Sequence, residues 1–145
     1  MKEVKLKFLK RIERAITVSS LRFAPDEKID FFPGQFLQLF FDEKNPKNLE
    51  LNKYLSFSAS CTRDYIEVTK RISKSQFSSK LMNLKPGDSV LARAPFGNCI
   101  FKDEYKKIGF LIGGIGITPV ICILEYINDK KLPTDVLLLA LFKQE

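Results

Sequence analysis

The stretch Lys106-Lys107-Ile108-Gly109-Phe110-Leu111-Ile112-Gly113-Gly114-Ile115-Gly116-Ile117-Thr118-Pro119 decides the fold that the sequence predicts. A short apolar run with a glycine cluster behind it predicts a fully buried parallel strand. Thr118 is a suitable helix cap, and Pro119 suits the first helical position because its missing N–H has no partner there. Strand, glycine turn and helix in this order aim backbone N–H groups and the positive helix end at one point, where a phosphate can bind.

The spacing of the glycine motif leaves two interpretations open. Gly-Gly-x-Gly-x-Thr-Pro departs from the dinucleotide fingerprint G-x-G-x-x-G, because a proline takes the place of the third glycine. The glycines either bind a nucleotide or serve only the steric needs of a tight corner between strand and helix. The segments that precede the motif favour the first interpretation.

Size and composition are those of an ordinary globular chain. The 145 residues suffice for one domain, or for one small domain and part of another. Hydrophobic residues make up 45% and charged residues 28%, which is a common balance. No apolar run approaches the ~20 residues of a transmembrane helix, and the charged N-terminus lacks the apolar core of a signal peptide. We therefore expect a cytoplasmic protein with no membrane span.

The counts of histidine, cysteine and charged residues exclude or disfavour several kinds of functional site. The chain has no histidine, which excludes histidine catalysis and histidine metal ligands. Cys61, Cys99 and Cys122 are widely spaced and match neither a disulfide framework nor a Cys-x-x-Cys metal site, so we expect core residues. The net charge of +7 is spread over strand-like segments, which favours a solvated basic face over nucleic-acid binding.

The first 104 residues predict a small antiparallel barrel or sandwich, so the fold class is mainly β. Short segments alternate apolar and polar residues, Pro-Gly turns separate them, and one short helix begins near Ser73–Ser79. The expected strands start with Val4, Leu6 and Phe8 and continue over 16–21, 35–41, 53–60, 65–71 and 89–93, with turns at 33–34, 85–88 and 95–98.

Residues 105–145 predict the first βαβ unit of a Rossmann-like parallel α/β domain. Its strands are expected over 108–112 and 136–142, with a helix over 118–128. One such unit cannot cover both faces of a parallel sheet. The apolar strand Val136–Phe142 would then be an exposed edge that is open to association. We expect either that the chain is part of a longer protein or that another chain, or a second copy, covers this edge.

Three segments before the glycine motif carry cations and hydroxyls that suit one ligand. Lys53 to Ser56 places a cation, an aromatic ring and a hydroxyl on one strand, and Lys70 and Arg71 end the next strand. Ser75 to Ser79 opens a helix with free N–H groups and hydroxyls. Together these segments can hold a phosphate or diphosphate beside a flat ring.

The order of these segments resembles the ferredoxin-reductase-like flavoprotein superfamily, in which a pyridine-nucleotide domain follows a flavin-binding barrel. The resemblance implies that residues 1–104 form a small antiparallel Greek-key β-barrel that binds the flavin. The resemblance covers essentially the whole chain, and its strength lies in the order and spacing of motifs that are weak one by one. The motifs are Phe32-Pro-Gly-Gln-Phe36, Lys53-Tyr-Leu-Ser56, Val68-Thr-Lys-Arg71, Ser75-Gln-Phe-Ser78, Lys85-Pro-Gly-Asp88, Ala94-Pro-Phe-Gly-Asn98 and Gly113-Gly-Ile-Gly-Ile-Thr-Pro119.

The sequence departs from the family pattern at several of these positions. Lys53 replaces an arginine and so lacks its planar, bidentate fork. Leu55 stands where the family usually stacks an aromatic ring on the isoalloxazine, and the neighbouring Tyr54 should point to the opposite side of the strand. Ser75 and Ala94 replace glycines. The family continues with further strands where this sequence ends.

The resemblance implies a flavin-dependent oxidoreductase that passes a hydride from NAD(P)H to bound flavin and electrons on to an acceptor, such as a redox protein. It implies FAD, with FMN as the alternative, and NADH or NADPH as the donor. Since the cofactor carries the chemistry, no side chain is assigned a catalytic role. The residues assigned to cofactor binding are Lys53, Tyr54, Leu55, Ser56, Val68, Thr69, Lys70, Arg71, Ser75, Phe77, Ser78, Gly113, Gly114, Gly116, Ile117 and Thr118.

Two other functions remain open. The single βαβ unit is also compatible with a non-catalytic flavin or nucleotide module that needs a partner to complete its sheet. The basic charge and the exposed edge over 136–142 are compatible with an interaction protein whose barrel has lost its cofactor.

Overall fold

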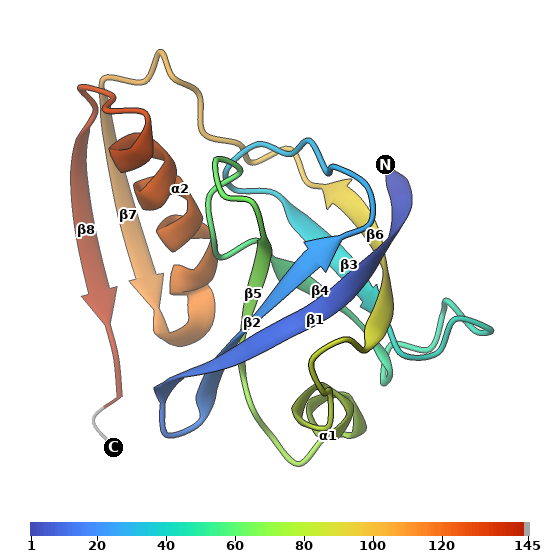
Figure 1. Ribbon diagram of the computed structural model, residues 1–145. Helices are drawn as coiled ribbons and strands as arrows, with labels where there is room; N and C mark the ends of the chain where they lie inside the picture. The colour runs from blue at the N-terminus through green and yellow to red at the C-terminus, as the bar shows by residue number, and fades with distance from the viewer. Residues whose placement is uncertain (144–145) are drawn as a thin grey trace.

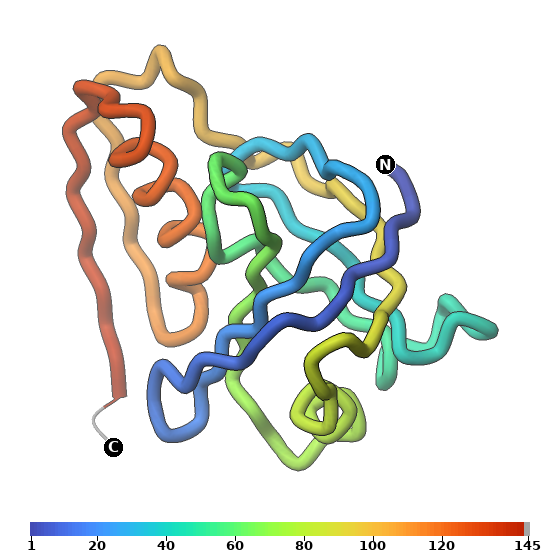
Figure 2. Tube along the Cα trace, viewed as in Figure 1, coloured from blue at the N-terminus to red at the C-terminus, as the bar shows by residue number. Residues whose placement is uncertain are grey.

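The computed structural model describes residues 1–143 and arranges them as two sheets with a helix between them (Figure 1). A curled antiparallel sheet comes first in the chain, and a two-stranded parallel sheet follows. The helix α2 (Thr118–Asp129) lies between the two sheets, as the ribbon and the tube of Figure 2 both show. This arrangement confirms the predicted mainly β fold, a barrel followed by a βαβ unit.

Six antiparallel strands form the barrel. They are β1 (Lys2–Ala15), β2 (Val18–Pro25), β3 (Phe36–Phe40), β4 (Asn52–Ser56), β5 (Ile66–Arg71) and β6 (Ser89–Phe96). Their order in the sheet is β4-β3-β6-β1-β2-β5. The two outer strands meet where Phe57, just after β4, forms an antiparallel bridge with Val68 of β5. Curling the sheet onto itself in this way reduces the length of unpaired strand edge.

The barrel core confirms the predicted alternation of the first strands. Val4, Leu6 and Phe8 of β1 are buried, and the lysines between them are exposed. Leu21 and Phe23 of β2 are fully buried, and the rings of Phe8 and Phe23 meet edge-on with centroids 5.7 Å apart. Burial of these large apolar side chains is the main favourable term in folding of the barrel.

The short helix and the first Pro-Gly turn also form where the sequence predicts them. The helix α1 (Gln76–Met82) closes one end of the barrel with Phe77 and Leu81 fully buried (Figure 1). In the turn at Pro33–Gly34, Gly34 has a φ of 106°. A side chain there would collide with the carbonyl oxygen of Cys99, so the position requires glycine.

Strand β6 is longer than predicted, and the expected turn beginning at Pro95 is wrong. The strand continues through Pro95 to Phe96 because it pairs with β1 on one side and with β3 on the other, where Phe96 lies opposite Phe36. Pro95 falls where the register between β3 and β6 shifts, so its missing N–H interrupts no regular ladder. The chain turns only afterwards, at Gly97, which has a φ of 97°.

The second sheet consists of β7 (Lys107–Gly113) and β8 (Asp135–Leu141), which are parallel and connected by α2. A 3-10 turn, η1 (Gly114–Ile117), joins β7 to α2. The predicted helix cap at Thr118 is wrong, because Thr118 is the first helical residue and Ile117 occupies the cap position without a side-chain hydrogen bond. The η1 turn already gives Ile117 helical angles, φ −66° and ψ −21°, so no extended residue is left to cap the helix.

Only one face of the second sheet is covered. Ile108 and Phe110 of β7 are half-buried and pack in one cluster with residues of α2, whereas Leu111 is 79% exposed. The prediction of a fully buried β7 is therefore wrong, because α2 lies on one side alone. All of β8 is exposed, which confirms the exposed apolar strand predicted over 136–142. We call the exposed residues Leu111, Leu137, Leu139 and Leu141 the outer leucine face.

We expect the outer leucine face to drive self-association at high protein concentration. Leu139→Lys places a charge at its centre, opposite Leu111, and should shift the chain toward monomer. Sedimentation velocity over a concentration series measures the change. Leu9→Lys is the control, since Leu9 is a single exposed leucine of the barrel and its replacement should leave association unchanged. Oligomers that persist in the Leu139→Lys variant would contradict this prediction.

Candidate functional site

A cavity of about 610 Å³ lies where the barrel faces the glycine loop. The β1–β2 hairpin and the end of β5 form one side, and η1, the first turns of α2 and the residues after β8 form the other. Its lining combines the cations Arg14, Arg71 and Lys143, the hydroxyls of Ser20 and Thr69, and the apolar side chains of Val18, Ile115, Ile117, Ile121 and Phe142. Apolar walls with a few polar groups are typical of sites for small molecules and cofactors.

Four residues that the sequence assigns to cofactor binding meet at this cavity. Thr69 and Arg71 come from β5, and Gly114 and Ile117 come from η1. Gly114 has a φ of 55°, and a side-chain Cβ at this position would lie 3.9 Å from the Nη2 atom of Arg71. The backbone of the glycine loop therefore passes close to the end of β5, which joins the two predicted motifs.

The other three residues of the glycine motif lie beside the cavity without lining it. Gly113 ends β7, and Thr118 is buried in the first turn of α2, with 7% of its surface exposed. Gly116 has open space where a Cβ would be, so a ligand can approach its backbone.

The predicted β4 segment lies on the outer strand of the barrel and outside the cavity lining. Leu55 packs against the barrel core, and Tyr54 is 52% exposed, as alternation along a strand requires. The ring of Tyr54 meets the rings of Phe36 and Phe96 edge-on, with centroids 5.8 and 5.7 Å apart. Ser56 lies opposite Phe36 and is half-buried.

Lys53 and Lys70 come close enough for their charges to interact. Burial lowers the pKa of Lys70, and the neighbouring Lys53 ammonium lowers it further. The Nζ atom of Lys70 donates a hydrogen bond of 3.1 Å to the carbonyl oxygen of Arg71. Two like charges at one place create a positive potential that an anion would relieve.

The predicted serines form a hydroxyl cluster at the start of α1. Ser75 is the N-cap of the helix, and its Oγ accepts from the backbone N–H of Ser78 at 3.2 Å. The hydroxyl of Ser78 is fully buried and accepts from the backbone N–H of Ser73 at 3.1 Å. Ser73, which the sequence includes in the expected helix start but not among the cofactor-binding residues, joins this cluster and donates from its hydroxyl to Oγ of Ser75 at 3.1 Å.

Val68 and Phe77 are fully buried in the barrel core. Their side chains support the strand and the helix that carry the other predicted residues. Only their backbone groups can contact a ligand.

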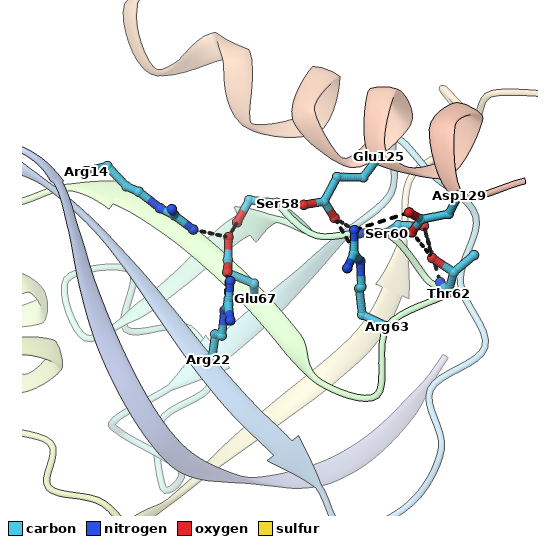
Figure 3. A network of polar contacts seen from close by, with 9 residues as sticks. All are labelled: Arg14, Arg22, Ser58, Ser60, Thr62, Arg63, Glu67, Glu125 and Asp129. Carbon is cyan, nitrogen blue, oxygen red and sulfur yellow. Dashed lines mark hydrogen bonds and ion pairs between the residues drawn. The ribbon is translucent and has the colours of Figure 1, made fainter. Parts of the chain in front are cut away.

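Polar contacts anchor α2 to the barrel loop that follows β4 (Figure 3). The backbone N–H of Ser60 donates to Oε2 of Glu125 at 2.9 Å, and the hydroxyl of Thr62 donates to Asp129 at 2.5 Å. Arg63 forms ion pairs with both carboxylates, at 3.6 Å to Glu125 and 3.2 Å to Asp129. Because α2 begins directly after the glycine loop, these contacts set where the loop lies relative to the barrel.

A buried carboxylate, Glu67, lies behind the cavity wall. Its side chain is 5% exposed and accepts from Nε of Arg22 at 2.7 Å, from Nη2 of Arg14 at 3.5 Å and from the hydroxyl of Ser58 at 3.3 Å (Figure 3). A buried charge requires such partners, because an unpaired one costs several kcal/mol. Sequence analysis missed Arg14, Ser20 and Glu67, since each reads as an ordinary polar residue of an alternating strand.

Metal-binding clusters and membrane-spanning helices were not found in the described part of the chain. Within residues 1–143, histidine, cysteine, aspartate and glutamate side chains do not gather in a group able to hold a metal ion. No helix of that range has the length and apolar character needed to cross a membrane. The three cysteines are free thiols. Cys122 is a buried core residue, as predicted, whereas Cys99 is exposed and Cys61 is half-buried.

Sequence comparison identifies relatives among electron transfer subunits, although no protein-family model matches the chain. A probable dihydroorotate dehydrogenase B (NAD(+)) electron transfer subunit of Pyrococcus abyssi is 39% identical over 116 residues, which cover 80% of this chain and 41% of that protein. The subunit of the same name from Methanocaldococcus jannaschii is 30% identical over 92% of this chain and 46% of its own length. The chain thus spans less than half the length of the curated relatives it matches.

Two reductases are among the solved structures with the same fold. Ferredoxin-NADP+ reductase from Plasmodium falciparum superposes with a TM-score of 0.80 at 17% identity, over 99% of this chain and 60% of that one. A ferredoxin NADP+ reductase from Neisseria gonorrhoeae with bound FAD and NADP gives a TM-score of 0.77 at 20% identity, over 97% and 57% of the two chains. At these identities the similarity establishes the fold.

We expect the anchoring contacts of α2 to stabilise the helix separately from the barrel. Glu125→Ala removes the acceptor of the Ser60 N–H and one partner of Arg63, which should cost roughly 1 kcal/mol. Hydrogen exchange should accelerate at amides of α2 and stay slow in β1 and β2. Asp30→Ala is the control, because Asp30 forms only an exposed ion pair with Lys28. Equal acceleration in helix and barrel would contradict a local role.

The three cysteines should differ in reactivity. Burial raises the pKa of the Cys122 thiol to about 12, so at pH 8 it remains protonated and shielded in the folded chain. An aromatic disulfide reagent at pH 8 should modify Cys99 first and Cys122 only after unfolding in guanidinium. Cys99→Ser should remove the fast phase, and rapid modification of Cys122 in the native protein would contradict the buried position of this thiol.

Proposed function

We propose that this chain, which shares its fold with ferredoxin reductases and carries motifs in an order that resembles theirs, is a flavin-binding electron transfer protein. In this proposal the flavin is FAD, NAD(P)H is the electron donor, and the acceptor is a redox partner. The observation that carries the proposal is the cavity shared by the barrel strand β5 and the glycine loop, with Thr69 and Arg71 on one side and Gly114 and Ile117 on the other. The relatives named as electron transfer subunits support it.

The residues around the cavity fit a flat ring that carries phosphate. Ile115, Ile121 and Phe142 supply apolar surface for a ring, and Arg71 and Lys143 supply positive charge beside it. Lys53 and Lys70 add a second positive site on the barrel, where relief of their mutual repulsion favours an anion. Anionic phosphates and an uncharged aromatic ring require these two kinds of surface.

Most of the predicted residues have a role in this proposal. Lys53, Lys70 and Arg71 bind phosphate oxygens, with Ser75 and the buried Ser78 ordering the adjoining helix start. Leu55 and Ser56 of β4 lie outside the cavity lining, and in this proposal they border the part of the flavin that extends from the cavity toward β4. The glycine loop up to Thr118 orients the nucleotide that donates electrons. When bound, the flavin supplies hydride and single-electron chemistry, while the protein provides orientation, charge and exclusion of water.

A second candidate function is a flavin-binding subunit that transfers electrons only when a partner covers its second sheet. The exposure of β8 along its whole length favours this candidate, because a parallel sheet is normally covered on both faces. Anaerobic mixing of the flavin-loaded chain with NADH or NADPH separates the two functions. Bleaching of the flavin within seconds supports an oxidoreductase, and an unchanged spectrum supports the partner-dependent subunit.

We expect Lys53 and Lys70 to bind the phosphate part of the flavin. Replacing both by glutamine should weaken binding of FMN by roughly tenfold and leave riboflavin, which has no phosphate, unaffected. Quenching of flavin fluorescence measures both affinities. Lys7→Gln combined with Lys28→Gln removes the same two charges from exposed lysines and is the charge-matched control. A wild-type chain that quenches neither flavin would overturn the proposed function.

A further inference from the structure

The contacts of Glu67 fix the direction of the hydroxyl protons along one wall of the cavity. Nε of Arg14 donates to Oγ of Ser20 at 3.0 Å, and the Ser58 hydroxyl donates to Oε1 of Glu67 at 3.3 Å. Between these two serines lies Thr69, whose Oγ1 is 2.7 Å from Oγ of Ser20 and 2.8 Å from Oγ of Ser58. Arg14 also contacts Glu67, so the five side chains close a ring.

Counting protons assigns every donor in this ring. A hydroxyl has one proton, and the carboxylate of Glu67 can only accept. Ser58 gives its proton to Glu67, because a bond to a charged acceptor is about twice as strong as one between neutral groups. Thr69 must then donate to Ser58, and Ser20 must donate to Thr69.

The assigned directions determine what the wall can offer a ligand. Thr69 has used its only proton, so toward the cavity its Oγ1 can act only as an acceptor. Arg14 lines the same cavity with its side chain 45% exposed, and it has N–H groups beyond those bonded to Ser20 and Glu67. The wall therefore presents a cationic donor beside a neutral acceptor.

We propose that Arg14 and Thr69 recognise the amide edge of a planar ring, with Arg14 donating to its carbonyl oxygen and Thr69 accepting from the neighbouring N–H. The imide edge of a flavin and the carboxamide of a nicotinamide both offer a carbonyl oxygen beside an N–H. That the ring is one of these two rests on the proposed function. A phosphate ester suits the wall less well, because at neutral pH it is largely deprotonated and lacks a proton for Thr69. Glu67 acts as a positioning residue, since it orients Arg14 directly and Thr69 through Ser58.

Two pairs of ring compounds test this recognition by fluorescence titration of the whole chain. The first pair is riboflavin and 3-methylriboflavin, in which a methyl group replaces the imide proton. The second pair is reduced nicotinamide mononucleotide and its 3-acetylpyridine analogue, which keeps the carbonyl and lacks the N–H. We expect the wild-type chain to prefer the N–H compound in one pair by roughly three- to tenfold, the value of one net hydrogen bond. The pair that shows the preference identifies the ring.

Substitutions among these five side chains test whether the Thr69 hydroxyl is held as an acceptor or is free to donate. Thr69→Val removes the acceptor and should abolish the preference. Ser58→Ala keeps Thr69 but frees its proton to point toward the ligand, so the preference should also fall. Thr17→Val is the matched control, because the Thr17 hydroxyl is buried in the same β1–β2 hairpin and has no hydrogen-bond partner among the described residues.

The outcomes distinguish this inference from the proposed function. A preference that survives in Thr69→Val, or that disappears equally in Thr17→Val, overturns the amide site. Equal wild-type affinity within both pairs also overturns it, while leaving flavin binding intact. A wild-type chain that binds neither riboflavin nor FMN in a saturable way overturns the proposed function itself.

Discussion

The contact between α2 and the barrel is the interaction on which the candidate site depends. Cys122 of the helix is buried within the barrel core cluster, while Glu125 and Asp129 hold the loop after β4 through Ser60, Thr62 and Arg63. Apolar burial supplies the attraction, and the directed hydrogen bonds fix the rotation and height of the helix. Because η1 leads directly into α2, fixing the helix also fixes the glycine loop opposite the end of β5.

On the barrel side, rigidity comes from a buried charge. Removing Glu67 from water is unfavourable unless its oxygens find partners, and two arginines with one serine provide them. Arg14 lines the cavity itself, and Ser58 is hydrogen-bonded to Thr69, which also lines the cavity. A charge that costs free energy to bury thus orders the groups that would meet a ligand, as electrostatic preorganisation requires.

The second sheet, in contrast to the buried charge of the barrel, leaves apolar side chains exposed to water. Ile123 and Ile127 of α2 pack with Ile108 and Phe110 on one face, while Leu139 and its neighbours on the other face remain in contact with solvent. Apolar area left in water gives a driving force for any protein surface of matching shape. The cavity lies at the carboxyl ends of β7 and β8, whereas the outer leucine face is the uncovered face of the same two strands, so the two surfaces are distinct.

The sequence by itself determined the strands, the turn at Gly34, the βαβ unit and the order of motifs, because alternation, glycine and proline act within a few residues. Through the resemblance, the sequence also assigned Thr69, Arg71, Gly114 and Ile117 to one site, and these four residues line the same cavity. Tertiary structure decided the rest: that η1 displaces Thr118 from the cap, that pairing with β3 extends β6 through Pro95, and that α2 covers one face of the second sheet. It alone placed Arg14, Ser20 and Glu67 at one wall, since Arg14 and Glu67 lie 53 residues apart and no local pattern reports contacts between distant strands.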